Sequence, residues 1–156
     1  MSTMYSSALT LHSVLRWVVL LMGLLAAARA CAGWKGQRPW TAADNRAGVW
    51  FTIALDLQLL AGLGLYLVLS PLTQAAFENI AATMRNSSLR FWTVEHPFGM
   101  MIALVLAHVG RVRIRKATTD QSRHQTAAIF FVIALVIILL SLPWPGTPNA
   151  RPWFRW

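Results

Sequence analysis

Two histidines of this sequence stand where an imidazole could do chemistry. His12 lies in an apolar run and is followed four residues later by Arg16, so both belong to one face of a helix. His96 follows Glu95 directly and begins a second apolar run. Imidazole is a frequent metal ligand, and two histidines on facing helices can supply the axial ligands of a b-type haem. His12 and His96 are therefore candidate ligands of a haem iron.

Stripes of small residues continue both histidine faces, and they leave two interpretations open. The first stripe is Val19, Gly23, Ala26 and Ala30, and the second is Gly99, Ala103, Ala107 and Gly110. If the stripes face each other, they leave room for a flat macrocycle. Alternatively, they are ordinary close helix contacts, and His12 and His96 hydrogen-bond to Glu95, Arg16 or the backbone. The spacing alone does not decide between the two.

Other polar residues within the apolar runs need partners, because an isolated charge inside a membrane is costly. Arg16 can pair with Glu95, with Asp56 or with a haem propionate. Asp56, with Gln58 on a different face nearby, can hold Arg16 or carry protons; the ion pair is favoured, since one acid makes no relay. His108 and His124 form a lower-ranked second metal site at the other end, where His124 is expected at the wet interface.

The elements that position these residues are transmembrane helices. Crossing the ~30 Å hydrocarbon layer requires about 20 mostly apolar residues, and four segments of this chain of 156 residues satisfy that length. Their approximate ranges are 8–31, 46–69, 91–110 and 124–142. The sequence predicts an all-α polytopic membrane protein, a single four-helix transmembrane domain spanning 1–156, with an interfacial helix over about 71–90. Thr41 and Asp44 form a capping box that starts the second span.

The distribution of basic residues predicts the orientation. Nine basic residues lie in or beside the first and third connections: Arg29, Lys35, Arg38, Arg46, Arg111, Arg113, Arg115, Lys116 and Arg123. Four lie in the second connection and the tail: Arg85, Arg90, Arg151 and Arg155. The positive-inside rule places both termini outside the bacterial cytoplasmic (inner) membrane. His12 and His96 then lie at matching depth near the outer ends of parallel helices.

The same distribution indicates that the net charge of +9 serves contact with lipid headgroups rather than binding of nucleic acid. The run 111–116 suits membrane lipid headgroups, and no nucleic-acid motif accompanies it. Cys31 is the only cysteine, which excludes an internal disulfide and a multi-thiolate metal site. The sequence contains no hydrolase triad and no phosphate-binding glycine loop.

Three motifs resemble a family of short four-helix bacterial membrane proteins often labelled cytochrome b-like. They are Leu11-His12-Ser13-Val14-Leu15-Arg16-Trp17, Gln58-Leu59-Leu60-Ala61-Gly62 and Arg90-Phe91-Trp92-Thr93-Val94-Glu95-His96-Pro97. The resemblance covers nearly the whole chain, and it implies haem and a site at His12, Arg16, Gln58, Glu95 and His96. The family often has histidine where this chain has Asp56, so a ligand role is not carried to that position.

These observations favour an electron-transfer protein over a stand-alone enzyme. The leading hypothesis is a redox subunit, alone or in a homo- or hetero-oligomer, that passes electrons between a quinone or a partner protein and haem b near the outer face. Two alternatives stay open. One is a non-catalytic membrane subunit or assembly factor with a buried ion-pair network, and the other is a small transporter or proton path using Asp56.

Overall fold

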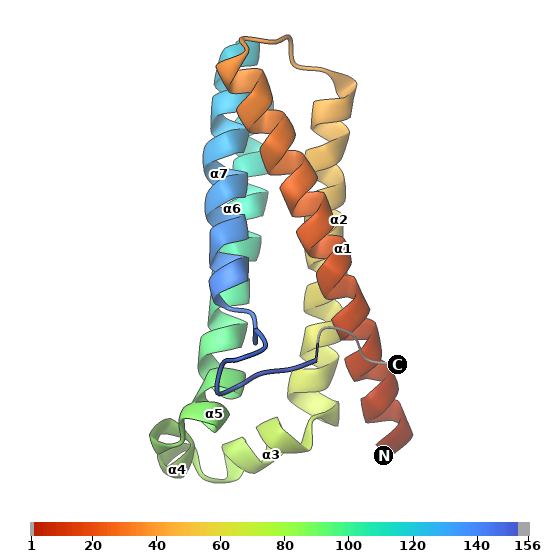
Figure 1. The fold of residues 1–156 in the computed structure, drawn as a ribbon, viewed down its shortest axis with the longest axis vertical. Helices are drawn as coiled ribbons and strands as arrows, with labels where there is room; N and C mark the ends of the chain where they lie inside the picture. The colour runs from red at the N-terminus through yellow and green to blue at the C-terminus, as the bar shows by residue number, and fades with distance from the viewer. Residues whose placement is uncertain (1, 153–156) are drawn as a thin grey trace.

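Four long antiparallel helices form the molecule, as the sequence predicts. The computed structural model describes residues 2–152, and within this range it contains helices and no strand. The long helices are α1 (Ser2–Lys35), α2 (Ala42–Gly64), α6 (His96–Lys116) and α7 (Asp120–Leu140) (Figure 1). Each belongs to a segment long and apolar enough to cross a membrane, which confirms the all-α, four-span fold. Arg155, counted above in the tail, lies outside the described residues.

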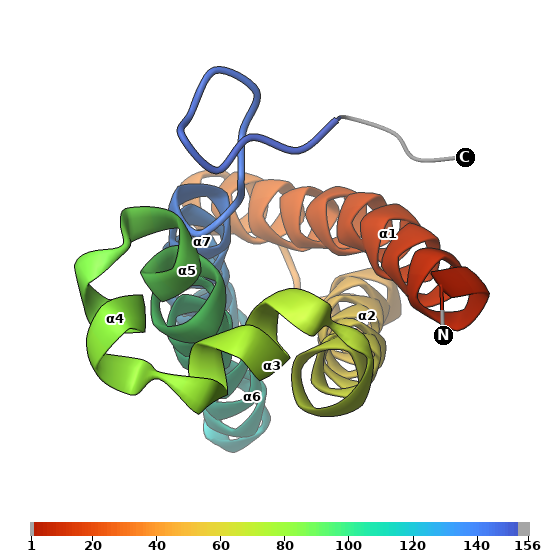
Figure 2. The same cartoon turned by 90° about the horizontal axis from the view of Figure 1, so that it is seen from below.

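The helices follow one another around a bundle in the order α1, α2, α6, α7. Helix α7 packs against both α1 and α6, whereas α1 and α6 lie diagonally across the bundle (Figures 1 and 2). The connections 36–41 and 117–119 meet at one end, which we call the basic end. Residues 2 and 152 and the segment 70–90 lie toward the opposite end, which we call the hairpin end.

Close packing of small residues holds the bundle together, and it corrects one expectation. The two small-residue stripes do not face each other: a Cβ on Gly23 would meet Phe51 of α2 and Leu135 of α7, and one on Gly110 would meet Phe130 of α7. Ala103 and Ala107 are fully buried. Because each stripe is filled by its own neighbouring helix, the stripes are helix contacts and provide no slot for a macrocycle.

Side-chain caps fix the helix starts at the basic end. The Thr41 hydroxyl accepts a hydrogen bond from the Asp44 amide, and Asp44 in turn accepts from the Thr41 amide at 2.9 Å, so the predicted capping box is present. Arg29 of α1 donates to the same carboxylate at 2.9 Å. This contact ties the end of α1 to the start of α2.

The segment between the second and third spans forms three short helices rather than the single interfacial helix predicted. They are α3 (Pro71–Glu78), α4 (Ile80–Arg85) and α5 (Ser87–Arg90). Two asparagines cause the breaks: the Asn79 side chain accepts from the amide of Ala82, and the Asn86 side chain accepts from those of Ser88 and Leu89. Each asparagine therefore starts a new helix instead of continuing the old one.

Each of two prolines follows a π-helical turn. The turns are η1 (Leu65–Leu69), before Pro71, and η2 (Phe91–Glu95), before Pro97. Pro97 has no N–H to donate to the carbonyl of Thr93, four residues earlier. The Tyr66 hydroxyl of η1 donates to that carbonyl instead, at 2.8 Å. The Tyr66 hydroxyl thus joins the two π-helical turns directly. Because η2 immediately precedes His96, it sets the direction of that side chain at the start of α6.

Candidate functional site: histidines in the bundle

The rings of His12 and His96 lie against each other edge to face, across the diagonal of the bundle. Their centroids are 6.3 Å apart and their planes are inclined by 73°. His12 comes from α1 and His96 is the first residue of α6, two helices that lie diagonally across the bundle (Figure 2). The structure therefore brings together the two histidines that the sequence placed at one depth.

His96 is held by the segment that follows α7. Its Nδ1 lies 2.8 Å from the carbonyl oxygen of Ser141, and a carbonyl can only accept, so Nδ1 carries the proton. Gly99 permits this approach, because a Cβ there would overlap the Ser141 side chain. Nε2 makes no hydrogen bond to any residue of 2–152 and keeps a lone pair for a ligand.

His12 is held in a similar way from α2. Its Nε2 lies 3.1 Å from the Gln58 side-chain amide, while Nδ1 of His12 and Oε1 of Gln58 are buried without a hydrogen-bond partner in the described chain. If the Gln58 amide turns its oxygen toward His12, the Nε2–H of His12 donates to that oxygen. Nδ1 of His12 is then the only ring nitrogen of this residue without a hydrogen bond to residues 2–152. Gly62, one turn beyond Gln58, lets the ring lie close, since a Cβ there would come within 3.1 Å of Cε1.

Arg16 and Glu95 do not form the ion pair that the sequence suggested. Glu95 accepts from Nε of Arg90 at 2.7 Å, on an exposed part of the hairpin end. The Arg16 guanidinium lies 3.4 Å from the Ser13 hydroxyl and 5.4 Å from the centroid of the Trp17 ring. It also lines a cavity of about 10 Å³, large enough for one water molecule, beneath Leu142.

Asp56 has a partner that residue spacing does not predict. Its carboxylate lies 2.8 Å from Nε2 of His108, and the two side chains are 48% and 44% exposed. Asp56 therefore does not hold Arg16. The pair was missed because the third span was expected to end at residue 110, which placed His108 near a helix end. Helix α6 instead continues to Lys116, so His108 lies two turns inside it.

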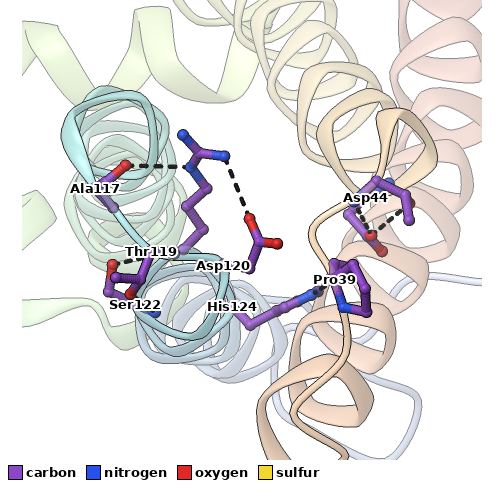
Figure 3. Close-up of polar contacts among 9 residues, drawn as sticks. Pro39, Asp44, Ala117, Thr119, Asp120, Ser122 and His124 are labelled. Atoms are coloured by element: carbon purple, nitrogen blue, oxygen red, sulfur yellow. Dashed lines mark hydrogen bonds and ion pairs between the residues drawn. The ribbon is translucent and has the colours of Figure 1, made fainter.

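His124 is a packing residue and not a partner of His108. Its side chain is 1% exposed, lies 4.8 Å from the Trp40 ring centroid, and has Nε2 3.4 Å from the Pro39 carbonyl (Figure 3). Gly33 of α1 leaves the space for it. Helix α7 begins at Asp120, one turn earlier than predicted, and this carries His124 from the expected wet interface into the core.

The described residues thus contain two histidine sites of different kinds. No group of three or more histidine, cysteine or acidic side chains lies close enough together within 2–152 to hold a metal ion by itself. Comparison of the chain with known protein families, with curated proteins and with solved structures found no match.

Proposed function

We propose that the protein is a membrane redox subunit in which His12 and His96 hold a b-type haem. The observation that carries the proposal is the adjacent pair of imidazoles, each anchored through one nitrogen and each with the other nitrogen left over among the described residues. Metal-ligating histidines characteristically donate their second ring N–H to a carbonyl or a similar acceptor. The Ser141 carbonyl would serve that purpose for His96, and the Gln58 side chain would serve it for His12 with its amide oxygen turned toward Nε2.

The ring separation suits a single metal atom between the two imidazoles. A metal–nitrogen bond to histidine is about 2 Å long, so His12 and His96 would hold one metal atom between them through one nitrogen each. Ring centroids 6.3 Å apart are compatible with that arrangement. A metal held by only two protein ligands needs its other ligands from elsewhere, and a haem macrocycle would supply them. Because the small-residue stripes are filled by helix contacts, the macrocycle would have to displace side chains at the hairpin end to reach the two rings.

The surrounding residues support a redox role. When bound, haem would accept and donate single electrons. The positive charge of Arg16, one turn from His12, would balance a propionate. Phe91 and Trp92 lie beside His96 at centroid distances of 6.0 and 5.7 Å and exclude water from the ring. The electron partner in this proposal is a quinone or another membrane protein.

An absorption spectrum of the purified full-length protein, with and without added haem, tests the proposal. We expect a Soret band that shifts on reduction and is lost in His12→Ala and in His96→Ala. His108→Gln is the matched control, because it alters a histidine of the bundle outside the site and should keep the band. A colourless protein that takes up no added haem, or a band unchanged in both alanine variants, would falsify the proposal.

A second candidate is a proton path, favoured by the position of Asp56 and His108. This ionisable pair lies within two predicted spans and is half-exposed, and Gln58 and His12 form a second polar contact nearer the hairpin end. Proton flux into liposomes containing the protein should then fall at least tenfold in Asp56→Asn. Flux that is absent, or unchanged by this substitution, rejects the candidate.

A further inference from the structure

A cleft lies between α2 and α6 on the half of the molecule nearer the basic end. It has a volume of about 590 Å³, and His108 is its lining residue farthest from that end. At a rise of about 1.5 Å per residue, the eight steps from His108 to Lys116 give the lined face of α6 a length of about 12 Å. The cleft is therefore long enough to hold a sizeable part of an amphiphilic molecule.

Two polar contacts join α2 to α6 around the cleft. His108 contacts Asp56, and the buried Arg111 donates through both terminal nitrogens to the side-chain oxygen of Asn45, at 3.1 Å each. Neither contact fills the space between the helices. The two helices are thus held beside each other with a gap that their own side chains do not close.

The lining of the cleft combines an apolar wall with a strongly basic mouth. Val49, Val109 and Val112 form the apolar wall, beside Thr52 and the buried Arg111. Val109 and Val112 are 40% and 49% exposed. The exposed side chains of Arg113, Arg115 and Lys116 surround the mouth. This combination fits a ligand with an anionic head and an apolar body.

No acidic side chain of the described chain neutralises this mouth. At the basic end Asp44 is bound by Arg29 and Asp120 by Arg123, while Asp56 is bound by His108. Glu78 and Glu95, the remaining acids, belong to the hairpin end. The positive charge of the mouth is therefore available to an external anion.

We propose that the cleft binds one anionic phospholipid, with its phosphate at Arg115 and Lys116 and its acyl chains against the valine walls. Basic pockets between transmembrane helices are suited to anionic headgroups, since each basic side chain at the surface adds attraction and desolvation is small. A free phosphate ion would use the mouth but would gain nothing from the walls. The phospholipid uses both.

Native mass spectrometry of the full-length protein, titrated with phosphatidylglycerol or with phosphatidylcholine of identical chains, tests this site. We expect one tightly bound phosphatidylglycerol and at least tenfold weaker binding of phosphatidylcholine. Arg115→Gln combined with Lys116→Gln should weaken phosphatidylglycerol binding roughly 10- to 30-fold. Lys35→Gln combined with Arg38→Gln removes the same charge from the same end outside the cleft, and should change binding less than threefold.

A second pair of variants separates a lipid in the cleft from an anion at the mouth. Val112→Trp narrows the cleft and keeps all its charges, and should weaken binding at least fivefold. Val132→Trp, on an exposed face of α7, is its control and should have no effect. Equal losses in the two charge variants, an unaffected Val112→Trp protein, or displacement of the lipid by excess inorganic phosphate would each overturn the proposal.

Discussion

The two histidine pairs of this molecule differ in the groups that hold them and in the burial of the ring nitrogens left over. At the His12–His96 pair, neutral groups hold one nitrogen of each ring, and Nδ1 of His12 is buried without a hydrogen-bond partner among residues 2–152. At the Asp56–His108 pair, a carboxylate holds Nε2 of the imidazole beside a cleft, and Nδ1 of His108, which also makes no hydrogen bond to these residues, is not buried. A buried ring nitrogen without a partner therefore separates the first pair from the second.

The strongest way to break this comparison is to disturb the His12 ring without removing it. Gly62→Leu places a side chain against Cε1 of His12, so we expect at least a tenfold loss of haem absorbance with the helical content retained. Gly64→Leu is the control, because a Cβ at Gly64 meets nothing within 4 Å. Retention of the full Soret band in the Gly62→Leu protein would show that close contact between Gly62 and the His12 ring is not needed for the site.

His124 sharpens the comparison, because it is buried in the core, whereas His12, His96 and His108 are partly exposed. His124→Ala leaves a cavity beside Trp40 and should lower the free energy of unfolding by about 2–5 kcal/mol, as large-to-small core substitutions do. The measurement is unfolding in a mixed-micelle titration. Any haem spectrum should stay unchanged, and a lost Soret band in a folded His124→Ala protein would contradict the assignment of the site.

Tyr66→Phe tests the bridge that sets the direction of His96. The substitution leaves the Thr93 carbonyl without its donor and should destabilise the protein by about 1 kcal/mol. We also expect a small shift of the Soret maximum, since η2 leads directly into His96. Tyr5→Phe, near the start of α1, serves as the control and should leave both properties unchanged.

The smallest effect is expected at the Asp56–His108 pair. Asp56→Asn keeps a hydrogen bond to His108 and removes only the charge of the side chain, so we expect the free energy of unfolding to change by about 1 kcal/mol, the size of a single hydrogen-bond contribution. The same micelle titration measures it. A loss comparable to that of His124→Ala would mean that the pair is a core contact rather than a half-exposed one.

The spans could be predicted from the sequence because length and apolar composition determine them, but their ends could not. The third span was ended at Gly110, where the basic run starts, yet basic side chains are favourable in the last turn of a helix. Helix α6 accordingly includes Arg113, Arg115 and Lys116. Because α6 extends past residue 110, His108 lies inside the helix, where it contacts Asp56, and the shorter predicted span did not indicate this contact.

The candidate site was predicted in part for a similar reason. Depth along a helix follows from residue counting, so the proximity of His12 to His96 could be anticipated. The neighbour of each helix face depends on how the helices are arranged, which counting does not determine. The small-residue stripes were therefore assigned to each other, although α2 and α7 fill the first and α7 fills the second. The anchor Ser141 lies beyond the end of α7, where no periodic pattern points to it.

The π-turn before His96 has a consequence for how the chain tolerates changes in length. A π-turn accommodates one residue more than the α-helical ladder would, and every side chain before it is rotated by about 100° relative to a continuous α-helix. Removal of a single residue within 91–95 would allow an ordinary helix and would swing Arg90 and the preceding turn around the axis. A variant of this chain that keeps His96 but lacks one residue of this turn would thus present a differently assembled hairpin end above an unchanged bundle.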